Sequence, residues 1–278
     1  MNDLRPMRAD DIASIVAVIA DHDEDDGAAA AQTFARGDLR NLFVLEHRAR
    51  AAGVSGWAPI AGSDGAFWLS WTYLDRSLRG RGHGRRLVAH ALDELRYRGA
   101  RKVFVKVSDY RDDVTGDLYG AARRCYARAG FEQALFVRDY YDAGENLTIL
   151  ALELDAPSKR PTPAAPIQDE YPAIEIERWF EIDETDGAWT LAWRVRPGRS
   201  GLGAAIAHAG ESAFNAINLE RGLALARDEG ARAVFLSFPS NLPRVVEPLA
   251  AVGLEPIGRL PDFHGRGLHE QHFARYFE

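Results

Sequence analysis

Residues 73–87 constrain the fold most strongly, because a loop of alternating arginine and glycine there joins an apolar run to a helical pattern. The run over residues 66–74 is β-rich, and apolar residues recur at helical spacing from Leu87 to Leu95. We therefore expect a strand, a loop and the first turn of a helix. The loop glycines have no Cβ, so successive amides can converge on one anion at the positive end of the helix. This arrangement predicts a diphosphate-binding loop.

The loop fits the motif R-x-x-G-x-G, formed by Arg79, Gly82 and Gly84. It does not fit the dinucleotide fingerprint, because Arg85 stands where the third glycine belongs, and it lacks the Gly-Lys-Ser/Thr end of a Walker loop. Between a strand and a helix, the motif resembles the acyl-CoA loop of the GNAT superfamily of N-acetyltransferases. The alternative is a basic, glycine-rich turn that binds nothing. The resemblance implies acetyl-CoA as co-substrate, with contacts from Tyr73, Leu74, Arg79, Gly80, Arg81, Gly82, His83, Gly84, Arg85 and Tyr119.

Residues 122–131 have the pattern A-x-x-x-Y-x-x-x-G-F, which resembles the GNAT segment whose tyrosine lies beside the CoA sulfur. The resemblance makes Tyr126 the candidate general acid, because a phenol with a pKa of ~10 can protonate the thiolate that leaves in thioester aminolysis. The alternative is a core aromatic residue on an amphipathic helix. The family often has Asn three residues before Ala122, where this chain has Tyr119, so the usual pantetheine contact differs here.

The acceptor amine arrives protonated and must lose a proton before it can attack the thioester. Two carboxylates at expected strand ends, Asp109 and Asp75, are the candidate bases, and either can instead cap a turn. We assign the catalytic role to Asp109. By resemblance to the family, a backbone N–H of residues 71–74 would polarise the thioester oxygen at a strand irregularity.

An acidic run, Asp21 to Gly27, follows the first expected helix, which Asp10 and Asp11 cap ahead of Ile12. We expect the run to be a loop before a short helix over residues 28–34. Two interpretations stay open. The run is either a solvated helix end or a negative patch that attracts a cationic amine, because the corresponding segment of the GNAT fold often borders the acceptor site.

An Asp-Gly pair at residues 64–65 predicts a hairpin between strands over residues 54–60 and 66–75. A helix over residues 117–129 is also expected. Further strands are expected over residues 2–9, 41–47, 102–107, 134–141 and 147–154. The predicted fold class is α+β (α/β), with a mixed, mostly antiparallel sheet flanked by helices in the GNAT order.

The second half of the chain repeats part of the first. Residues 52–71 align without gaps on residues 174–193, so that Trp57 meets Trp179 and Trp71 meets Trp193. Shorter matches follow: Gly99-Ala100-Arg101 with Gly230-Ala231-Arg232, Gly130-Phe131-Glu132 with Gly253-Leu254-Glu255, and Asp139 and Gly144 with Asp262 and Gly267. The repeat predicts a tandem GNAT protein with a truncated second copy.

The expected domains are a catalytic one over residues 1–154, a Pro-rich linker over 155–173 and a degenerate copy over 174–278. The second glycine loop, residues 197–203, has Gly198 in place of the motif's first basic residue, and Leu249 stands where the first copy has Tyr126. We expect the second copy to be structural or to shape the acceptor site.

Composition narrows the classes of partner. The net charge of −7 gives the 278-residue chain no global attraction to nucleic acid or to an anionic membrane. A single cysteine, Cys125, cannot form an intrachain disulfide and is compatible with a reducing cytoplasm, where we place the protein. We expect no metal, since the histidines have no ligand spacing with Cys125, and no membrane-spanning segment. A homodimer is compatible with the sequence.

The predicted function is therefore transfer of an acetyl group from acetyl-CoA to a primary amine of a small molecule. One alternative is a protein that binds acyl-CoA without turnover, and another is acetylation of a peptide or protein N-terminus. Tyr126 and the intact loop favour catalysis, whereas Tyr119 at the usual Asn position argues against it. The sequence does not identify the acceptor or the acyl length.

Overall fold

The computed structural model describes residues 3–37, 39–112, 116–154, 215–228, 230–240 and 245–277, and the backbone of four short strands between residues 175 and 196. The chain divides into two compact units. Their segments are Met1–Val105, Tyr119–Glu132 and Leu150–Pro157 in the first unit, and Lys106–Leu118, Gln133–Ile149 and Ser158–Glu278 in the second. Within these described ranges, every helix is too short or too polar to cross a membrane.

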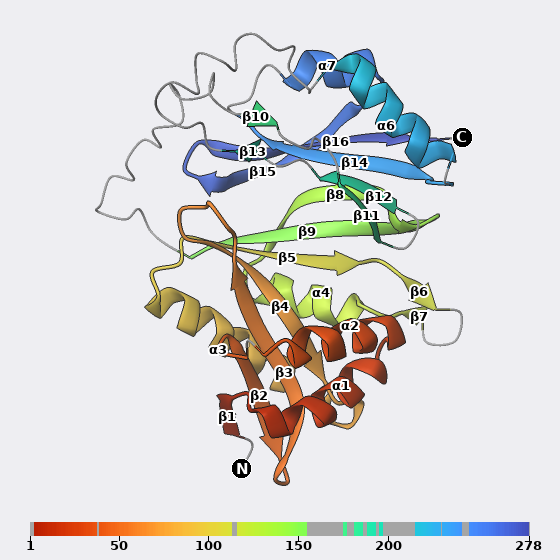
Figure 1. The fold of residues 1–278 in the computed structure, drawn as a ribbon. Coiled ribbons are helices and arrows are strands. Elements are labelled where there is room, and N and C mark those ends of the chain that lie inside the picture. Colours follow the sequence, from red (N-terminus) through yellow and green to blue (C-terminus); the bar gives the residue numbers. More distant parts are fainter. Residues whose placement is uncertain are drawn as a thin grey trace. The chain divides into compact units, whose positions relative to one another are not determined.

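The first sheet has seven strands in the order β1-β2-β3-β4-β5-β9-β8 (Figure 1). Their bounds are β1 Asp3–Pro6, β2 Leu42–His47, β3 Arg50–Pro59, β4 Ala66–Leu74, β5 Lys102–Ser108, β9 Glu145–Glu153 and β8 Glu132–Asp142. The first four strands pair antiparallel, and β4 is parallel to β5. The Asp-Gly turn thus joins β3 to β4 as a hairpin, which confirms the prediction from residues 64–65.

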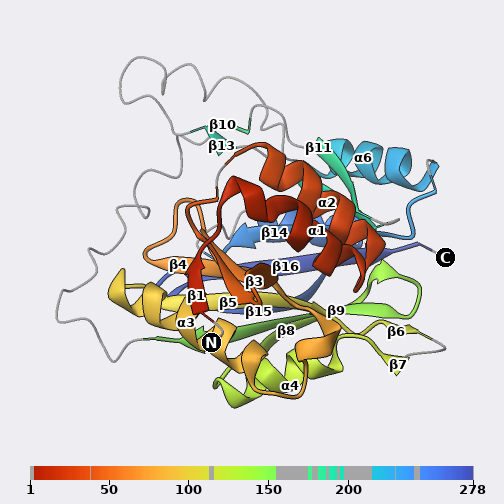
Figure 2. The same cartoon turned by 90° about the horizontal axis from the view of Figure 1, so that it is seen from below.

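Helices cover both faces of strands β2–β4 (Figures 1 and 2). On one face lie α1, Ile12–Ala20, and α2, Glu24–Ala35, whose apolar side chains pack with those of β2–β4 in one buried cluster. On the other face lie α3, His83–Tyr97, and α4, Gly120–Arg128. The predicted α3 therefore begins within the glycine loop, where Leu87 anchors its first turn in the core beside Leu45 and Ala52.

Two element boundaries differ from the expectation. Helix α2 begins at Glu24, so the acidic run is a short turn followed by the first helical turn, and a loop through Gly27 is wrong. The reason is Asp23, whose Oδ1 accepts from the backbone N of Asp25 at 3.0 Å and of Asp26 at 3.1 Å and so caps the helix. Likewise α4 starts at Gly120 instead of Asp117, because β7, Gly116–Asp117, pairs with β6, Arg111–Asp112.

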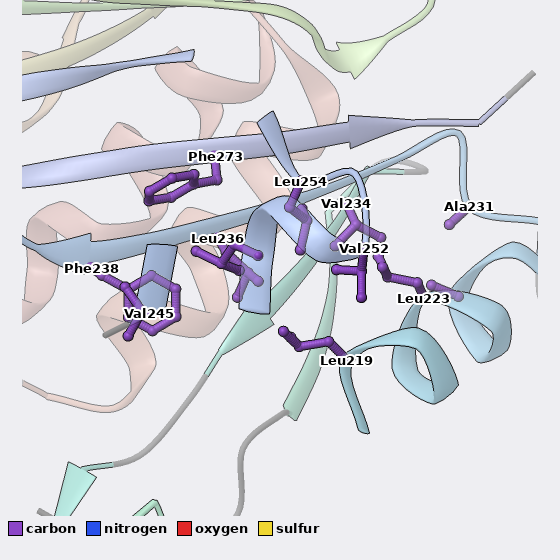
Figure 3. Close-up of a cluster of buried hydrophobic side chains, with 12 residues drawn as sticks. Leu219, Leu223, Ala231, Val234, Leu236, Phe238, Val245, Val252, Leu254 and Phe273 are labelled. Carbon is purple, nitrogen blue, oxygen red and sulfur yellow. The ribbon is translucent and has the colours of Figure 1, made fainter. Parts of the chain in front are cut away.

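A second sheet has five strands in the order β11-β12-β14-β16-β15. Their bounds are β11 Glu181–Thr185, β12 Ala188–Ala192, β14 Ala233–Pro239, β16 Leu268–Tyr276 and β15 Glu255–Gly265. Helix α6, Ala216–Asp228, contributes Leu219 and Leu223 to a core that also contains residues of β14 and β16 (Figure 3). Helix α7, Val246–Ala251, contributes Leu249 to the same core. A separate pair of strands, β10 Glu175–Ile176 and β13 Val195–Arg196, is antiparallel.

The order of the second sheet is that of strands β3-β4-β5-β9-β8 in the first. In each sheet two strands are parallel through three residue pairs. These pairs are Ala66, Phe67 and Trp68 with Lys102, Val103 and Phe104, and Ala188, Trp189 and Thr190 with Ala233, Val234 and Phe235. The two sets occupy equivalent positions of the sequence repeat.

The hairpins that follow also have matching hydrogen bonds. Asp139 and Asp262 both have positive φ, at 49° and 53°. In each hairpin the aspartate Oδ1 accepts from a glycine N, at 2.8 Å from Gly144 and at 2.8 Å from Gly267. The backbone N of Asp139 donates a hydrogen bond to Asn146 Oδ1 at 2.9 Å, and the backbone N of Asp262 donates one to His269 Nδ1 at 2.9 Å. Both acceptors lie on the next strand. The two sheets therefore share strand order, parallel register and turn chemistry.

Candidate active site

The glycine loop presents open backbone at the start of α3. Gly80 and Gly82 have φ values of 73° and 81°, in the left-handed region that glycine tolerates. A Cβ built on Gly80, Gly82 or Gly84 would meet no atom within 4 Å, so the space beside this backbone is free. The side chains of Arg81, Arg85 and Arg86 are exposed around it. Backbone amides at the start of a helix, beside arginine side chains, suit a diphosphate.

Strand β4 is interrupted just before the loop. Trp71 has φ 50°, and the register with β3 shifts between the pairs Gly56 with Ser70 and Val54 with Tyr73. Trp71 and Thr72 thus oppose the single residue Ser55, which is a bulge. The parallel register of β4 with β5 ends earlier, at Trp68. The expected strand irregularity over residues 71–74 is confirmed, while its role toward a thioester stays a prediction.

Tyr126 lies on α4 and is 5% exposed, and its ring packs edge-on against Phe131. Its hydroxyl hydrogen-bonds with the side chain of Thr72, the second residue of the bulge. Thr72 Oγ1 lies 3.0 Å from Ser55 Oγ, so a hydroxyl chain runs from α4 into β3. Burial raises the pKa of Tyr126 to about 12, which keeps the phenol protonated. Tyr126 is therefore buried as a core aromatic would be, and it also presents a protonated hydroxyl at the bulge.

Tyr73 and Tyr119, which the sequence places with the cofactor, direct their hydroxyls to the start of α2. Tyr73 donates a short hydrogen bond to Asp26 Oδ2. Tyr119 Oη lies 3.0 Å from Asp23 Oδ2 and 3.3 Å from Asp26 Oδ2. The ring of His22 packs edge-on against both tyrosines, with centroid distances of 5.6 Å and 5.4 Å. A cofactor contact by either hydroxyl stays a prediction.

The turn between α1 and α2 is tied to the glycine loop by two arginines. Arg79 Nη2 lies 3.0 Å from His22 Nδ1, and Arg76 Nε lies 3.0 Å from Asp21 Oδ2. Burial, together with the charges of Arg79 and Arg76, lowers the pKa of His22 to about 4. His22 is therefore neutral near pH 7. The sequence reasoning did not single out this histidine, and only its place within the acidic run could have drawn attention to it.

The two predicted carboxylate bases are both held by local partners. Asp109 Oδ1 accepts from the backbone N of Asn146 at 2.7 Å, and its Oδ2 accepts from Asn146 Nδ2 at 2.7 Å. Asp75 caps the short 3-10 helix Arg76–Leu78, accepting from Ser77 N at 2.9 Å and from Ser77 Oγ at 2.6 Å. These bonds, with Arg50, lower the pKa of Asp75. A catalytic role for Asp109 stays a prediction.

The remaining predicted residues surround the loop. Leu74 is partly buried against the core of Leu45 and Leu87, and its carbonyl accepts from Arg79 Nε at 3.4 Å. Burial, with Arg86 beside it, lowers the pKa of His83. Across the described ranges, the structure brings together no group of three or more His, Cys, Asp or Glu side chains that could hold a metal ion.

Residues 38–133 match the family model of the acetyltransferase (GNAT) domain. The match contains the bulge, the glycine loop and Tyr126, so the part of the chain over residues 38–133 carries a GNAT acetyltransferase domain, within the α+β fold described above. A comparison with curated proteins found no match.

Solved structures similar to this chain include acetyltransferases. The ribosomal-protein-S18-alanine N-acetyltransferase of Escherichia coli is 23% identical over 58% of this chain and 99% of its own, with a TM-score of 0.45. An N-acetyltransferase of Staphylococcus aureus Mu50 is 18% identical over 56% and 99%, with a TM-score of 0.45. A Salmonella typhimurium protein solved with its cofactor acetyl-CoA is 18% identical over 58% and 99%, with a TM-score of 0.47.

Proposed function

We propose that the chain is an N-acetyltransferase that moves an acetyl group from acetyl-CoA to a primary amine of a small molecule. The observation that carries the proposal is the position of Thr72. It belongs to the bulge that precedes the glycine loop, and its side chain bonds with the buried hydroxyl of Tyr126. The glycine loop and the interrupted strand thus come from one helix start and the strand before it, and the buried phenol bonds to that strand, which supports a site for acetyl transfer.

The residues fit acetyl-CoA at its two ends. The diphosphate would lie on the amides of residues 80–84, with Arg79, Arg81 and Arg85 adding charge. The thioester would lie along residues 71–74, where a backbone N–H of the bulge faces the carbonyl oxygen. Tyr73, Leu74, His83 and Tyr119 complete the proposed contacts.

The proposed reaction is direct aminolysis. The amine nitrogen attacks the thioester carbon and forms the C–N bond, while the carbonyl electron pair moves to the oxygen, which the bulge amide stabilises. The C–S bond then breaks and its electron pair stays on sulfur, which takes a proton from the Tyr126 hydroxyl. An ammonium acceptor loses two protons in all. The first leaves before attack, and the second leaves the nitrogen after the C–N bond forms and restores Tyr126.

A thiol-release assay with acetyl-CoA tests this proposal over a panel of amines, amino acids, polyamines and peptides. We expect saturable release of CoA with at least one small amine, and mass spectrometry should show one acetyl group on that amine. Release with peptides alone would favour the peptide N-terminal alternative. Binding of acetyl-CoA without transfer to any acceptor would contradict the proposed activity.

We further propose that the chain is a tandem in which residues 1–154 are catalytic and residues 174–278 are a truncated, degenerate copy. The shared strand order, the equivalent parallel pairs and the matching hydrogen bonds of Asp139 and Asp262 support this proposal. The expected linker, residues 155–173, and the second glycine loop, residues 197–203, lie outside the described residues. A cytoplasmic location is proposed from the single cysteine alone.

A further inference from the structure

Asp26 is held by two side chains, which come from separate segments of the first unit outside its own helix. It lies in the first turn of α2 and is half-buried. Tyr73, at the end of β4, donates to its Oδ2, and Tyr119, just before α4, lies 3.3 Å from the same oxygen. Two hydroxyls that converge on one oxygen fix the carboxylate and leave Oδ1 outside both bonds.

The position of Asp26 relative to the bulge suits proton transfer. Along β4, Trp71 and Tyr73 pack with the buried cluster of α1 and α2, whereas Thr72 bonds with Tyr126 of α4. Asp26 and Tyr126 therefore lie on opposite faces of β4. Asp26 is hydrogen-bonded to Tyr73, and Tyr126 is hydrogen-bonded to the preceding residue, Thr72. A base on one face and an acid on the other would let the amine and the thiolate use separate protons.

The other titratable groups near the bulge are weaker candidates for the base. His22 accepts from Arg79 through Nδ1, and its pKa of about 4 makes it a poor proton acceptor. Asp75 is occupied by Ser77 and Arg50, and the oxygens of Asp109 are occupied by Asn146. Among these groups, Asp26 is half-buried, and its Oδ1 lies outside the bonds from Tyr73 and Tyr119.

We propose that Asp26 accepts the first proton of the acceptor ammonium and that Tyr119 and Tyr73 position its carboxylate. This inference rests on the proposed acetyl transfer. The proton moves from nitrogen to a carboxylate oxygen, giving a neutral amine and a neutral Asp26, and it passes to solvent after turnover. The acceptor is thus an amine that arrives as a cation and approaches from the α1–α2 side of β4.

Several charges control the ionisation of Asp26. Burial raises its pKa, the charges of Asp23 and Asp25 raise it too, and the hydrogen bonds from Tyr73 and Tyr119 lower it. The charged and titratable groups nearest to it are Asp23 and Asp25 of the same turn, Tyr73 of β4 and Tyr119 before α4. His22 packs against both tyrosines and is bonded to Arg79, and Arg76 pairs with Asp21 beside it. The base must be ionised, so activity falls as the pH drops through the pKa of Asp26.

The pH dependence of kcat/KM separates this role from a structural one, because two variants should move the acid limb in opposite directions. Tyr119→Phe removes a hydrogen bond that favours the carboxylate, so the limb moves to higher pH. Asp23→Asn removes a repelling charge, so the limb moves to lower pH, and asparagine still caps α2. Glu24→Gln, exposed in the same turn, is the control and should leave the limb in place.

Asp26→Asn is the direct test and should lower kcat by about 10²- to 10⁴-fold while the affinity for acetyl-CoA, measured by calorimetry, stays unchanged. Circular dichroism verifies its fold, and the Tyr119 and Asp23 variants carry the test if it does not fold. If the wild type is active and the acid limb of kcat/KM lies at the same pH in the wild type and in both variants, the inference is overturned and the acetyltransferase proposal remains. A wild type that transfers acetyl to no amine would overturn both.

Discussion

At the scale of single residues, Tyr126 combines a buried ring with a hydroxyl that lies at the bulge of β4. Its hydroxyl bonds with the side chain of Thr72, in the bulge of β4. Ring burial alone would be satisfied by phenylalanine. The hydroxyl is therefore the part of the residue that a catalytic role would require, and it can be removed without disturbing the ring.

Tyr126→Phe should lower kcat with little change in acetyl-CoA affinity, because the proton is given to sulfur chiefly in the transition state. General-acid assistance is worth about 10²- to 10⁴-fold in rate, so the loss should be well above assay noise. In the pH profile of the wild-type rate, the fall in activity that Tyr126 causes at high pH should lie near its pKa of about 12, since the phenol must be protonated to act. Wild-type turnover in the variant would show that solvent or another residue protonates the thiolate.

Gly82→Asp should abolish acetyl-CoA binding in calorimetry, because a carboxylate would occupy the space beside the first amides of α3 and repel a diphosphate. The substitution also strains a residue with φ 81°. Gly62→Asp is the matched control, since Gly62 has φ 72°, has equally open space and lies in the β3–β4 turn. If both variants lost acetyl-CoA binding equally, backbone strain would explain the loss, and the proposed diphosphate site would not.

At the scale of elements, a charged pair connects β1 to the start of α1. Asp11, 7% exposed, accepts from Arg5 Nη1 at 2.7 Å and Nη2 at 2.8 Å, and from the backbone N of Arg8 at 2.8 Å. Arg5 also reaches Glu46 of β2 at 2.8 Å. The pair thus holds the start of the first helix against β1 and β2, the first two strands of the sheet.

Asp11→Ala should destabilise the fold by on the order of 2 kcal/mol, below the ~3 to 5 kcal/mol of a fully buried pair because Arg5 is partly exposed. Arg5 lowers the pKa of Asp11, so the stabilisation is present above the unfolded pKa of ~3.9 and is lost as the pH falls through the folded value. Urea unfolding at pH 7 and pH 3 measures both effects. Asp10→Ala, at an exposed neighbour, should change little, and a similar loss there would refute the assignment.

At the scale of the whole molecule, the shared topology of the two sheets raises the question of how many sites the chain has. The proposed second copy has a parallel strand pair and an aspartate turn that match those of the first. It has Leu249, fully buried in the α6–α7 core, at the place of Tyr126. Retention of packing residues with loss of the hydroxyl is expected of a copy that keeps its fold and not its chemistry.

We therefore expect one acetyl-CoA to bind per chain. Only the first copy combines R-x-x-G-x-G with the helical tyrosine, so titration calorimetry should give a stoichiometry near one. The Gly82→Asp variant should then bind none. A stoichiometry near two, or one remaining site in that variant, would show that the second copy also binds acetyl-CoA.

The sequence by itself determined the features that depend on neighbours along the chain. The β4–loop–α3 unit was predictable because glycine conformation, helix periodicity and the Asp64-Gly65 turn act over a few residues. Tyr126 was proposed from its surrounding pattern, and the repeat was proposed from aligned residues. The start of α2 was missed because Asp23 capped a helix earlier than the acidic composition indicated.

Only the tertiary structure decided which side chains meet at the bulge. Asp26 reaches Tyr73 and Tyr119 across 47 and 93 positions of sequence, and Thr72 reaches Ser55 across 17. Asp109, chosen as a base for its place at a strand end, is bonded to Asn146 from 37 positions away. Such pairs form when helices pack on a sheet, so their hydrogen bonds, burial and pKa shifts follow from packing geometry and leave no local pattern in the chain.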